Sequence, residues 1–78
     1  MTYAELLQML SDMHPDIDFE TAEGLIDRKI LTSFDVVSIA AELSETYDLD
    51  VSAVDIVPEN FNSARALYAL VQRLSDEA

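Results

Sequence analysis

The chain has 78 residues and no cysteine, and its 16 acidic residues against 4 basic ones give a net charge of −12. This length predicts a single domain covering residues 1–78, and the missing cysteine excludes a disulfide framework, a thiolate metal site and a cysteine nucleophile. The negative charge disfavours nucleic-acid and membrane binding. It fits partner proteins with basic patches, and the alternative is that it only keeps the domain soluble and monomeric.

The first ten residues, "MTYAELLQML", contain no basic region and no unbroken apolar run. We therefore expect neither a signal peptide nor a membrane span, and we expect the protein in the cytoplasm. Residues 3–13 predict a first helix, since apolar side chains recur there at helical spacing. The stripe consists of Tyr3, Leu6, Leu7, Leu10 and Met13.

Residues 14–32 form a long connection that contains Gly24, the only glycine. Connections of this length in a small domain are usually functional. Its apolar residues predict that it packs onto the body of the domain. They are Ile17, Phe19, Leu25, Ile26, Ile30 and Leu31.

Residues 33–47 predict the second helix, which is amphipathic. Its core stripe would be Val36, Ile39, Ala40, Leu43 and Tyr47, and its opposite side Asp35, Ser38, Glu42 and Glu45.

Two further helical segments complete the chain. Residues 52–61 predict a short helical turn around Pro58, because proline suits the first turn of a helix. Residues 63–75 predict the last helix, with Asn62 or Ser63 as its N-cap. Its core stripe would be Ala64, Leu67, Leu70, Val71 and Leu74. The expected fold is all-α, a small bundle of three to four helices with a long ordered loop between helices one and two.

Two groups of residues in or beside the long loop could form a metal-binding or catalytic site. For each group we favour the interpretation without such a site. "DIDFETAEGLID" puts Asp16, Asp18, Glu20 and Asp27 at ligand positions of a calcium-binding loop. Thr21 stands where that loop needs glycine, and Asp27 is shorter than the usual glutamate, so a solvated acidic loop is the better reading.

His14, the only histidine, offers a Ser–His–acid arrangement with Ser33 as a second possibility. No nucleophile-elbow glycines flank Ser33. We therefore expect an exposed histidine without a catalytic role.

The start of the second helix is more informative. "TSFD" is a capping-box pattern in which the Thr32 hydroxyl accepts from the backbone N–H near Asp35. The Ser33 hydroxyl is then free, at a helix N-terminus that favours an attached phosphate. The alternative is that Ser33 is itself the cap and nothing more.

Phe34 and Ala41 fall outside the core stripe and beside the acidic face. An exposed phenylalanine bordered by acids is typical of a docking patch for a basic partner. The alternative is that Phe34 folds back under the long loop.

The stretch "GLIDRKILTSFDVVSIAAELSETYDLDV", residues 24–51, resembles the acyl carrier protein family, including the stand-alone D-alanyl carrier type. The family's pattern falls here on Leu25, Ile26, Asp27, Ile30, Leu31, Ser33, Phe34, Asp35 and Tyr47. The resemblance extends more loosely over the whole chain, through its length, its acidity and the order of its helices.

The resemblance implies a carrier without catalytic residues of its own. A phosphopantetheinyl transferase would attach 4′-phosphopantetheine from coenzyme A to Ser33. The thiol of that arm would hold an acyl or aminoacyl group as a thioester, loaded by a ligase and passed to an acyltransferase or synthase. The residues that match the family's docking positions for these basic partners are Phe34, Asp35, Ala41, Glu42 and Glu45.

One position departs from the family. The aspartate that normally precedes the serine is Thr32 here. Threonine still caps a helix, but it removes a negative charge that the family offers to the transferase. The alternative reading is therefore a carrier-like acidic interaction module that is never modified.

Overall fold

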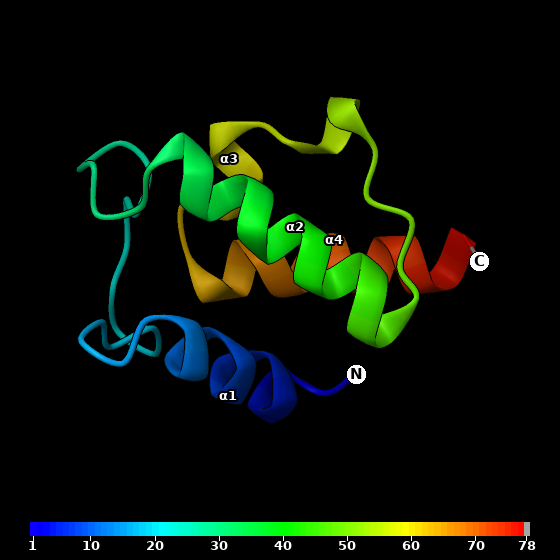
Figure 1. Ribbon diagram of the computed structural model, residues 1–78, viewed down its shortest axis with the longest axis horizontal. Coiled ribbons are helices and arrows are strands. Elements are labelled where there is room, and N and C mark those ends of the chain that lie inside the picture. The colour runs from blue at the N-terminus through cyan, green and yellow to red at the C-terminus, as the bar shows by residue number, and fades with distance from the viewer. Residues whose placement is uncertain (78) are drawn as a thin grey trace.

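The computed structural model describes residues 1–77 and shows an all-α chain (Figure 1). Its elements are α1 (Tyr3–Met13), α2 (Ser33–Tyr47), the 3₁₀ helix η1 (Ala53–Asp55), α3 (Pro58–Phe61) and α4 (Ala64–Glu77). No strand occurs within these residues. The fold-class prediction is confirmed. The bounds of the first two helices agree with the predicted ones, and the last helix runs to Glu77 rather than ending at residue 75.

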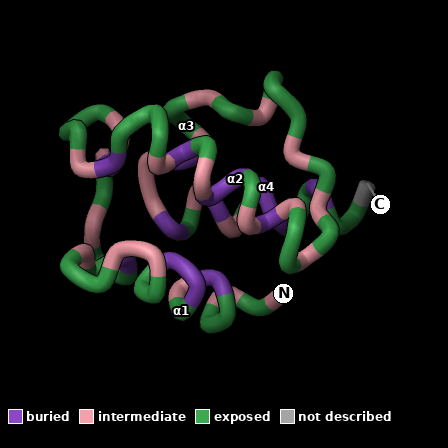
Figure 2. Tube along the Cα trace, in the orientation of Figure 1, coloured by how far each residue is buried: buried purple, intermediate pink, exposed green. Residues whose placement is uncertain are grey.

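The core is built largely by the predicted helical stripes. In α1 the predicted Leu7 is only partly buried, whereas Met9, which was not predicted, is buried. Figure 2 shows the buried stretches of the helices turned toward the middle of the molecule. The fully buried side chains include Leu6 and Leu10 of α1, Ile39 and Leu43 of α2, and Phe61 of α3. All five predicted core residues of α4 are buried as well. Periodic burial of this kind supplies most of the stability of short helices, which are marginal on their own.

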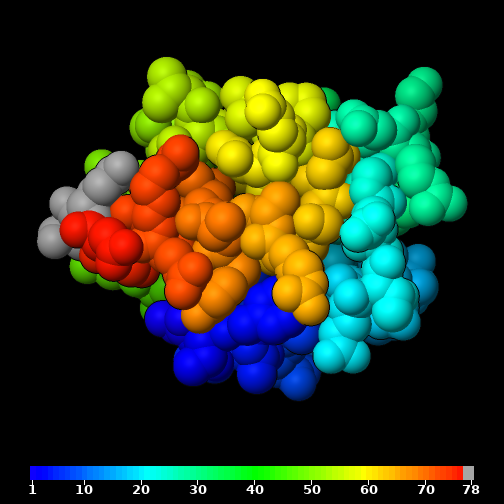
Figure 3. All heavy atoms as spheres, turned by 180° about the vertical axis from the view of Figure 1, so that it is seen from behind, coloured from blue at the N-terminus to red at the C-terminus, as the bar shows by residue number. Residues whose placement is uncertain are grey.

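Helix α4 connects the other elements. It packs against both α1 and α3, and the view from behind shows it between them (Figure 3). The ring of Tyr3, at the start of α1, lies 5.4 Å from the ring of Tyr68 on α4, at an interplanar angle of 59°. The guanidinium of Arg65 lies over the Tyr3 ring at 5.7 Å. These contacts fix the start of α1 against α4.

The long connection between α1 and α2 is packed onto the body, as predicted. Phe19, Leu25 and Leu31 are buried in the core. Ile17, Ile26 and Ile30 are partly buried and pack against it. The connection therefore stays in place through side-chain burial, although it contains no regular helix.

The second connection, between α2 and α3, is held by apolar packing of Leu49 and Val51 on the core and by a polar contact. Asp48 adopts a left-handed conformation, with φ of 56°, and ends α2. Arg73 of α4 contacts the carboxylate of Asp55 at 2.7 Å. Pro58 occupies the first turn of α3, which confirms the predicted turn.

Among residues 1–77 no helix has both the length and the apolar character that crossing a bilayer requires.

Asn62 and Ser63 were the two predicted N-caps of α4, and the hydrogen bonds identify which of them caps the helix. The Ser63 hydroxyl accepts a hydrogen bond from the Ala66 backbone N–H at 3.1 Å, and the Ser63 carbonyl accepts from Leu67 N–H at 3.0 Å. Ser63 is therefore the cap. The Asn62 side chain therefore takes no part in the cap, and it forms hydrogen bonds with the long loop instead.

Candidate functional site

Thr32 caps α2 with the predicted capping box. Its hydroxyl accepts a hydrogen bond from the Asp35 backbone N–H at 3.2 Å. The Asp35 carboxylate in turn accepts from the Thr32 backbone N–H at 2.9 Å and from the Thr32 hydroxyl at 3.0 Å. The alternative in which Ser33 is the cap is therefore wrong.

Ser33 is the first residue of α2 and is exposed. Within residues 1–77 its hydroxyl has no hydrogen-bond partner, and the backbone N–H groups of Ser33 and Phe34 also lack an acceptor. Such free N–H groups, together with the positive end of the helix dipole, favour a phosphate close to the serine. The hydroxyl is thus accessible, and an anion attached to it would meet hydrogen-bond donors.

An apolar pocket of about 190 Å³ opens beside Ser33. Apart from Ser33 itself, its walls come from three parts of the chain: the long loop, α2, and the segment that leads into α3. The lining side chains are Ile26, Val36, Val37, Ile56, Val57 and Pro58. A flexible group attached to Ser33 would therefore find apolar surface next to its point of attachment.

Asp35 contacts His14, at the end of α1, as well as Thr32. The Nε2 atom of His14 lies 3.4 Å from an Asp35 carboxylate oxygen, and the His14 ring lies against Phe19 at 6.4 Å between ring centres. The hydrogen bonds from the Thr32 backbone N–H and hydroxyl, and the neighbouring His14, hold the pKa of Asp35 below its ordinary value.

The contact of His14 with Asp35 does not support the Ser–His–acid arrangement with Ser33. Within the described residues His14 has this acidic partner, and no hydrogen bond joins it to Ser33. A general base must lie within hydrogen-bond reach of the proton that it removes. His14 is partly buried rather than exposed as expected, because its ring packs between the loop and α2.

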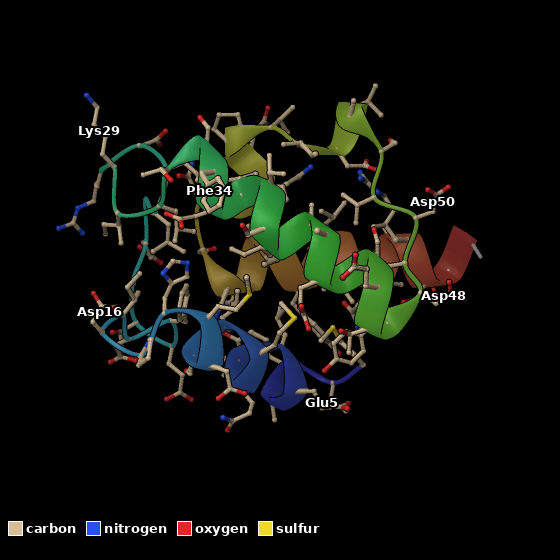
Figure 4. The ribbon with its side chains drawn as sticks, viewed as in Figure 1. Glu5, Asp16, Lys29, Phe34, Asp48 and Asp50 are labelled. Atoms are coloured by element: carbon tan, nitrogen blue, oxygen red, sulfur yellow. The ribbon has the colours of Figure 1, made fainter. Side chains whose placement is uncertain are left out.

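The predicted docking residues lie on one side of α2 and differ in how far they are exposed to solvent. Phe34 is 78% exposed, so the alternative in which it folds under the loop is wrong. Figure 4 shows it at the first turn of α2. Ala41 and Glu45 are also exposed. Glu42 is half-buried and accepts a hydrogen bond from the Thr46 hydroxyl at 2.7 Å.

The acidic loop that was compared with a calcium site gathers no metal ligands in this part of the chain. Within residues 1–77 no three His, Asp or Glu side chains come close enough to hold a metal ion. The Asp18 carboxylate instead accepts a hydrogen bond from the Thr21 hydroxyl at 3.0 Å. Figure 4 shows Asp16 at the outer edge of this loop.

The roles of three residues near the site were not predicted. Sequence reasoning missed the approach of His14 to Asp35, and it treated Asn62 only as a possible helix cap. Val37, which is 57% exposed and lines the pocket, was also not assigned to the site. Its position one turn after Ser33 is the signal that could have identified it, since residues four apart share a helix face.

No family model matches this chain, and comparison with curated proteins and with solved structures finds no match either.

Proposed function

We propose that this chain is a carrier protein that receives 4′-phosphopantetheine on Ser33 and carries an acyl or aminoacyl group on the thiol of that arm. The observation that carries the proposal is the exposed Ser33 hydroxyl, which has no partner in the described residues and borders an apolar pocket. The sequence resemblance to acyl carrier proteins supplies the identity of the arm. The chain has no cysteine, so the reactive sulfur would arrive with the cofactor.

The attachment step is a phosphoryl transfer that a separate transferase would catalyse. The Ser33 oxygen would attack the phosphorus next to the pantetheine part of coenzyme A, and the diphosphate bond would break. The adenosine bisphosphate part would leave, and the transferase would accept the hydroxyl proton. The free N–H groups of Ser33 and Phe34 would then face the new phosphodiester, where the helix dipole favours its charge.

The pocket beside Ser33 would serve the arm after attachment. Its lining is largely apolar, with Val36 and Val37 on one wall and Ile56 and Val57 on another. These side chains would contact the apolar parts of the arm or the start of its cargo. Burying apolar area contributes roughly 25 cal/mol per Å², so even partial contact would favour this position over solvent.

The exposed face of α2 would bind the partner enzymes. Phe34 offers an apolar anchor, and Glu45 and the remaining acidic residues of this face offer negative charge to a basic patch. Opposite charges speed the encounter and make it sensitive to salt. The partners on this proposal are a phosphopantetheinyl transferase, a loading ligase, and a downstream acyltransferase or synthase.

The direct test is attachment of the arm in solution. The purified chain is incubated with coenzyme A and, in turn, several recombinant phosphopantetheinyl transferases, and its intact mass is measured. A gain of one phosphopantetheine is expected for the wild type and for the matched control Ser38→Ala. No gain is expected for Ser33→Ala. An unmodified wild type with every transferase, or a modified Ser33→Ala variant, contradicts the proposal.

A second candidate is an unmodified acidic interaction module. The exposed Phe34 and Val37 side chains favour it, since apolar side chains on an acidic surface mark docking sites. This candidate predicts that Ser33→Ala leaves partner binding and cellular function intact, whereas Phe34→Ala weakens both. The carrier proposal predicts loss of function from both substitutions.

A further inference from the structure

The turn that leads into α2 is held by one residue from the junction of α3 and α4. The carboxamide oxygen of Asn62 accepts hydrogen bonds from the backbone N–H groups of Ile26 at 2.9 Å and Asp27 at 3.1 Å. Its amide nitrogen donates to the Asp27 carboxylate at 3.2 Å. The Asn62 backbone carbonyl accepts from Leu25 N–H at 2.8 Å. We refer to these four hydrogen bonds as the Asn62 bracket.

The orientation of the Asn62 carboxamide follows from its surroundings. Two N–H donors face one end of the group and a carboxylate faces the other. Only the orientation with oxygen toward the donors and nitrogen toward the carboxylate satisfies all three contacts. A side chain with only one kind of polar atom could not make this set.

The Asn62 bracket reaches the start of α2 through Leu25. The Leu25 carbonyl accepts hydrogen bonds from the N–H groups of Ile30 and Leu31, both at 2.9 Å, and Leu31 directly precedes the cap Thr32. The side chains of Leu25 and Leu31 are buried in the core. The turn of residues 24–31 is therefore closed on itself around Leu25, and Asn62 fixes the closed turn to the junction of α3 and α4.

The backbone of this turn depends on such support. Gly24 and Lys29 both have left-handed conformations, with φ of 62° and 60°. A lysine disfavours this region because its Cβ approaches the carbonyl oxygen. Figure 4 shows the Lys29 side chain pointing away from the body of the protein. The Lys29 N–H donates to the Ile26 carbonyl at 3.0 Å, so a hydrogen bond within the turn supports this conformation.

The same turn supplies one wall of the candidate site. Ile26, whose N–H is bound by Asn62, lines the pocket beside Ser33. The position of the turn therefore sets the shape of the pocket mouth and the path of the chain into Ser33. A loose turn would have to be ordered each time a partner bound this region, and that ordering would weaken binding.

We propose that Asn62 is a positioning residue for the modification of Ser33, which holds the turn 24–31 and the pocket wall in one arrangement for the transferase. This inference rests on the proposed function. It concerns a residue outside the docking face of α2, and it predicts an effect on recognition of the carrier rather than on the chemical step. Loss of such a binding-only contribution raises KM and leaves kcat unchanged.

The test uses a charge-conserving exchange. In Asn62→Asp the two N–H bonds can persist, but two carboxylates then oppose each other across the former contact with Asp27. Adding Asp27→Asn restores a donor–acceptor pair with the roles reversed and with the original net charge. The four proteins, wild type, Asp27→Asn, Asn62→Asp and the double exchange, form a cycle that isolates the contact. Asn62→Ala removes the whole side chain.

Steady-state kinetics of arm attachment are measured with coenzyme A in excess, a transferase that modifies the wild type, and a varied concentration of carrier. For Asn62→Ala we expect KM for the carrier to rise about tenfold, with kcat within about twofold. Asn62→Asp should also raise KM, and the double exchange should return it to within about threefold of the wild type. Circular dichroism confirms that each protein is folded at the assay temperature.

Amide hydrogen exchange tests the Asn62 bracket independently of the transferase. The N–H groups of Ile26 and Asp27 should exchange faster in Asn62→Ala than in the wild type, because they lose their acceptor. If Asn62→Ala does not fold, the comparison of Asn62→Asp with the double exchange decides the question.

An unchanged KM in a folded Asn62→Ala variant overturns the inference while the proposed function stands. So does a double exchange no better than Asn62→Asp alone. A wild type that accepts no arm from any transferase overturns the proposed function, and this role for Asn62 with it.

Discussion

The N-termini of α1 and α2 are built on the same capping box but differ in the residue that follows the cap. In α1 the Thr2 N–H donates to Glu5 at 2.7 Å and the Glu5 N–H donates to the Thr2 hydroxyl at 3.2 Å. In α2 the corresponding bonds join Thr32 and Asp35 at 2.9 and 3.2 Å. The first helical residue is Tyr3 in α1 and Ser33 in α2.

The two residues after the caps are used in different ways. Tyr3 is half-buried and packs against Tyr68 and Arg65, so the start of α1 is committed to the bundle. Ser33 is exposed beside a pocket, and its hydroxyl has no partner within the described residues. The capping pattern therefore explains why both helices begin where they do, and only the surroundings distinguish a structural start from a candidate site.

The largest expected effect on stability comes from Tyr3. Tyr3→Ala removes the ring contacts that hold α1 on α4, and we expect the free energy of unfolding to fall by about 2 kcal/mol. Urea denaturation followed by circular dichroism measures the change. Tyr3→Phe, which keeps the ring, should stay close to the wild type. A loss below about 0.5 kcal/mol in Tyr3→Ala would show that the start of α1 is not anchored in this way.

The two cap threonines should contribute alike. Thr2→Ala and Thr32→Ala each remove the side-chain acceptor of one orphan N–H, and each should lower the free energy of unfolding by about 1 kcal/mol. The serine replacements Thr2→Ser and Thr32→Ser keep the hydroxyl and serve as matched controls. If one alanine variant lost stability and the other did not, the equivalence of the two caps would be wrong.

The acidic members of the two caps predict a smaller effect that depends on pH. Hydrogen bonds from the cap threonines lower the pKa values of Glu5 and Asp35 below those of the free side chains. Each carboxylate therefore stabilises the fold fully above its unfolded pKa, and this stabilisation is lost as pH falls through the lower folded pKa.

Glu5→Gln and Asp35→Asn should both flatten the loss of stability in acid. The measurement is the urea midpoint at a series of pH values from neutral to about pH 3. The flattening is expected in both variants, because the N-terminal amine also lowers the pKa of Glu5 and His14 also lowers the pKa of Asp35. A steeper acid loss in either variant than in the wild type would contradict the assigned direction of the pKa shift.

The smallest effect on stability is expected at Ser33. Ser33→Ala removes a hydroxyl without a partner in the described residues, so the free energy of unfolding should change by less than about 0.5 kcal/mol. The same urea denaturation measures it. A loss comparable with that of Thr32→Ala would mean that Ser33 supports the helix, and the contrast with the caps would disappear.

Much of the fold could be predicted from apolar periodicity. The stripes that include Leu6, Leu43 and Leu70 mark three helices whose bounds the structure largely repeats. The "TSFD" pattern also identified Thr32 as the cap, because a capping box depends on residues only three apart. Local chemistry of this kind is readable from the sequence itself.

The contacts that complete the site could not be predicted in this way. Asn62 is separated by 36 positions from Ile26, and no periodic pattern relates the two residues. The approach of His14 to Asp35 likewise depends on where the long loop leaves the end of α1. Such contacts arise only when the helices have packed, so polar residues in loops carry no local signal of their partners.

Localising the arm on the loaded protein tests the central claim most directly. After treatment with coenzyme A and a transferase, trypsin cleavage following Lys29 and Arg65 yields a peptide covering residues 30–65, which contains both Thr32 and Ser33. Fragmentation mass spectrometry of this peptide locates the modified residue. We predict that the phosphopantetheine is on Ser33 and that Thr32 is unmodified. An arm on Thr32 or on another serine, or a peptide that is never modified, would contradict the account.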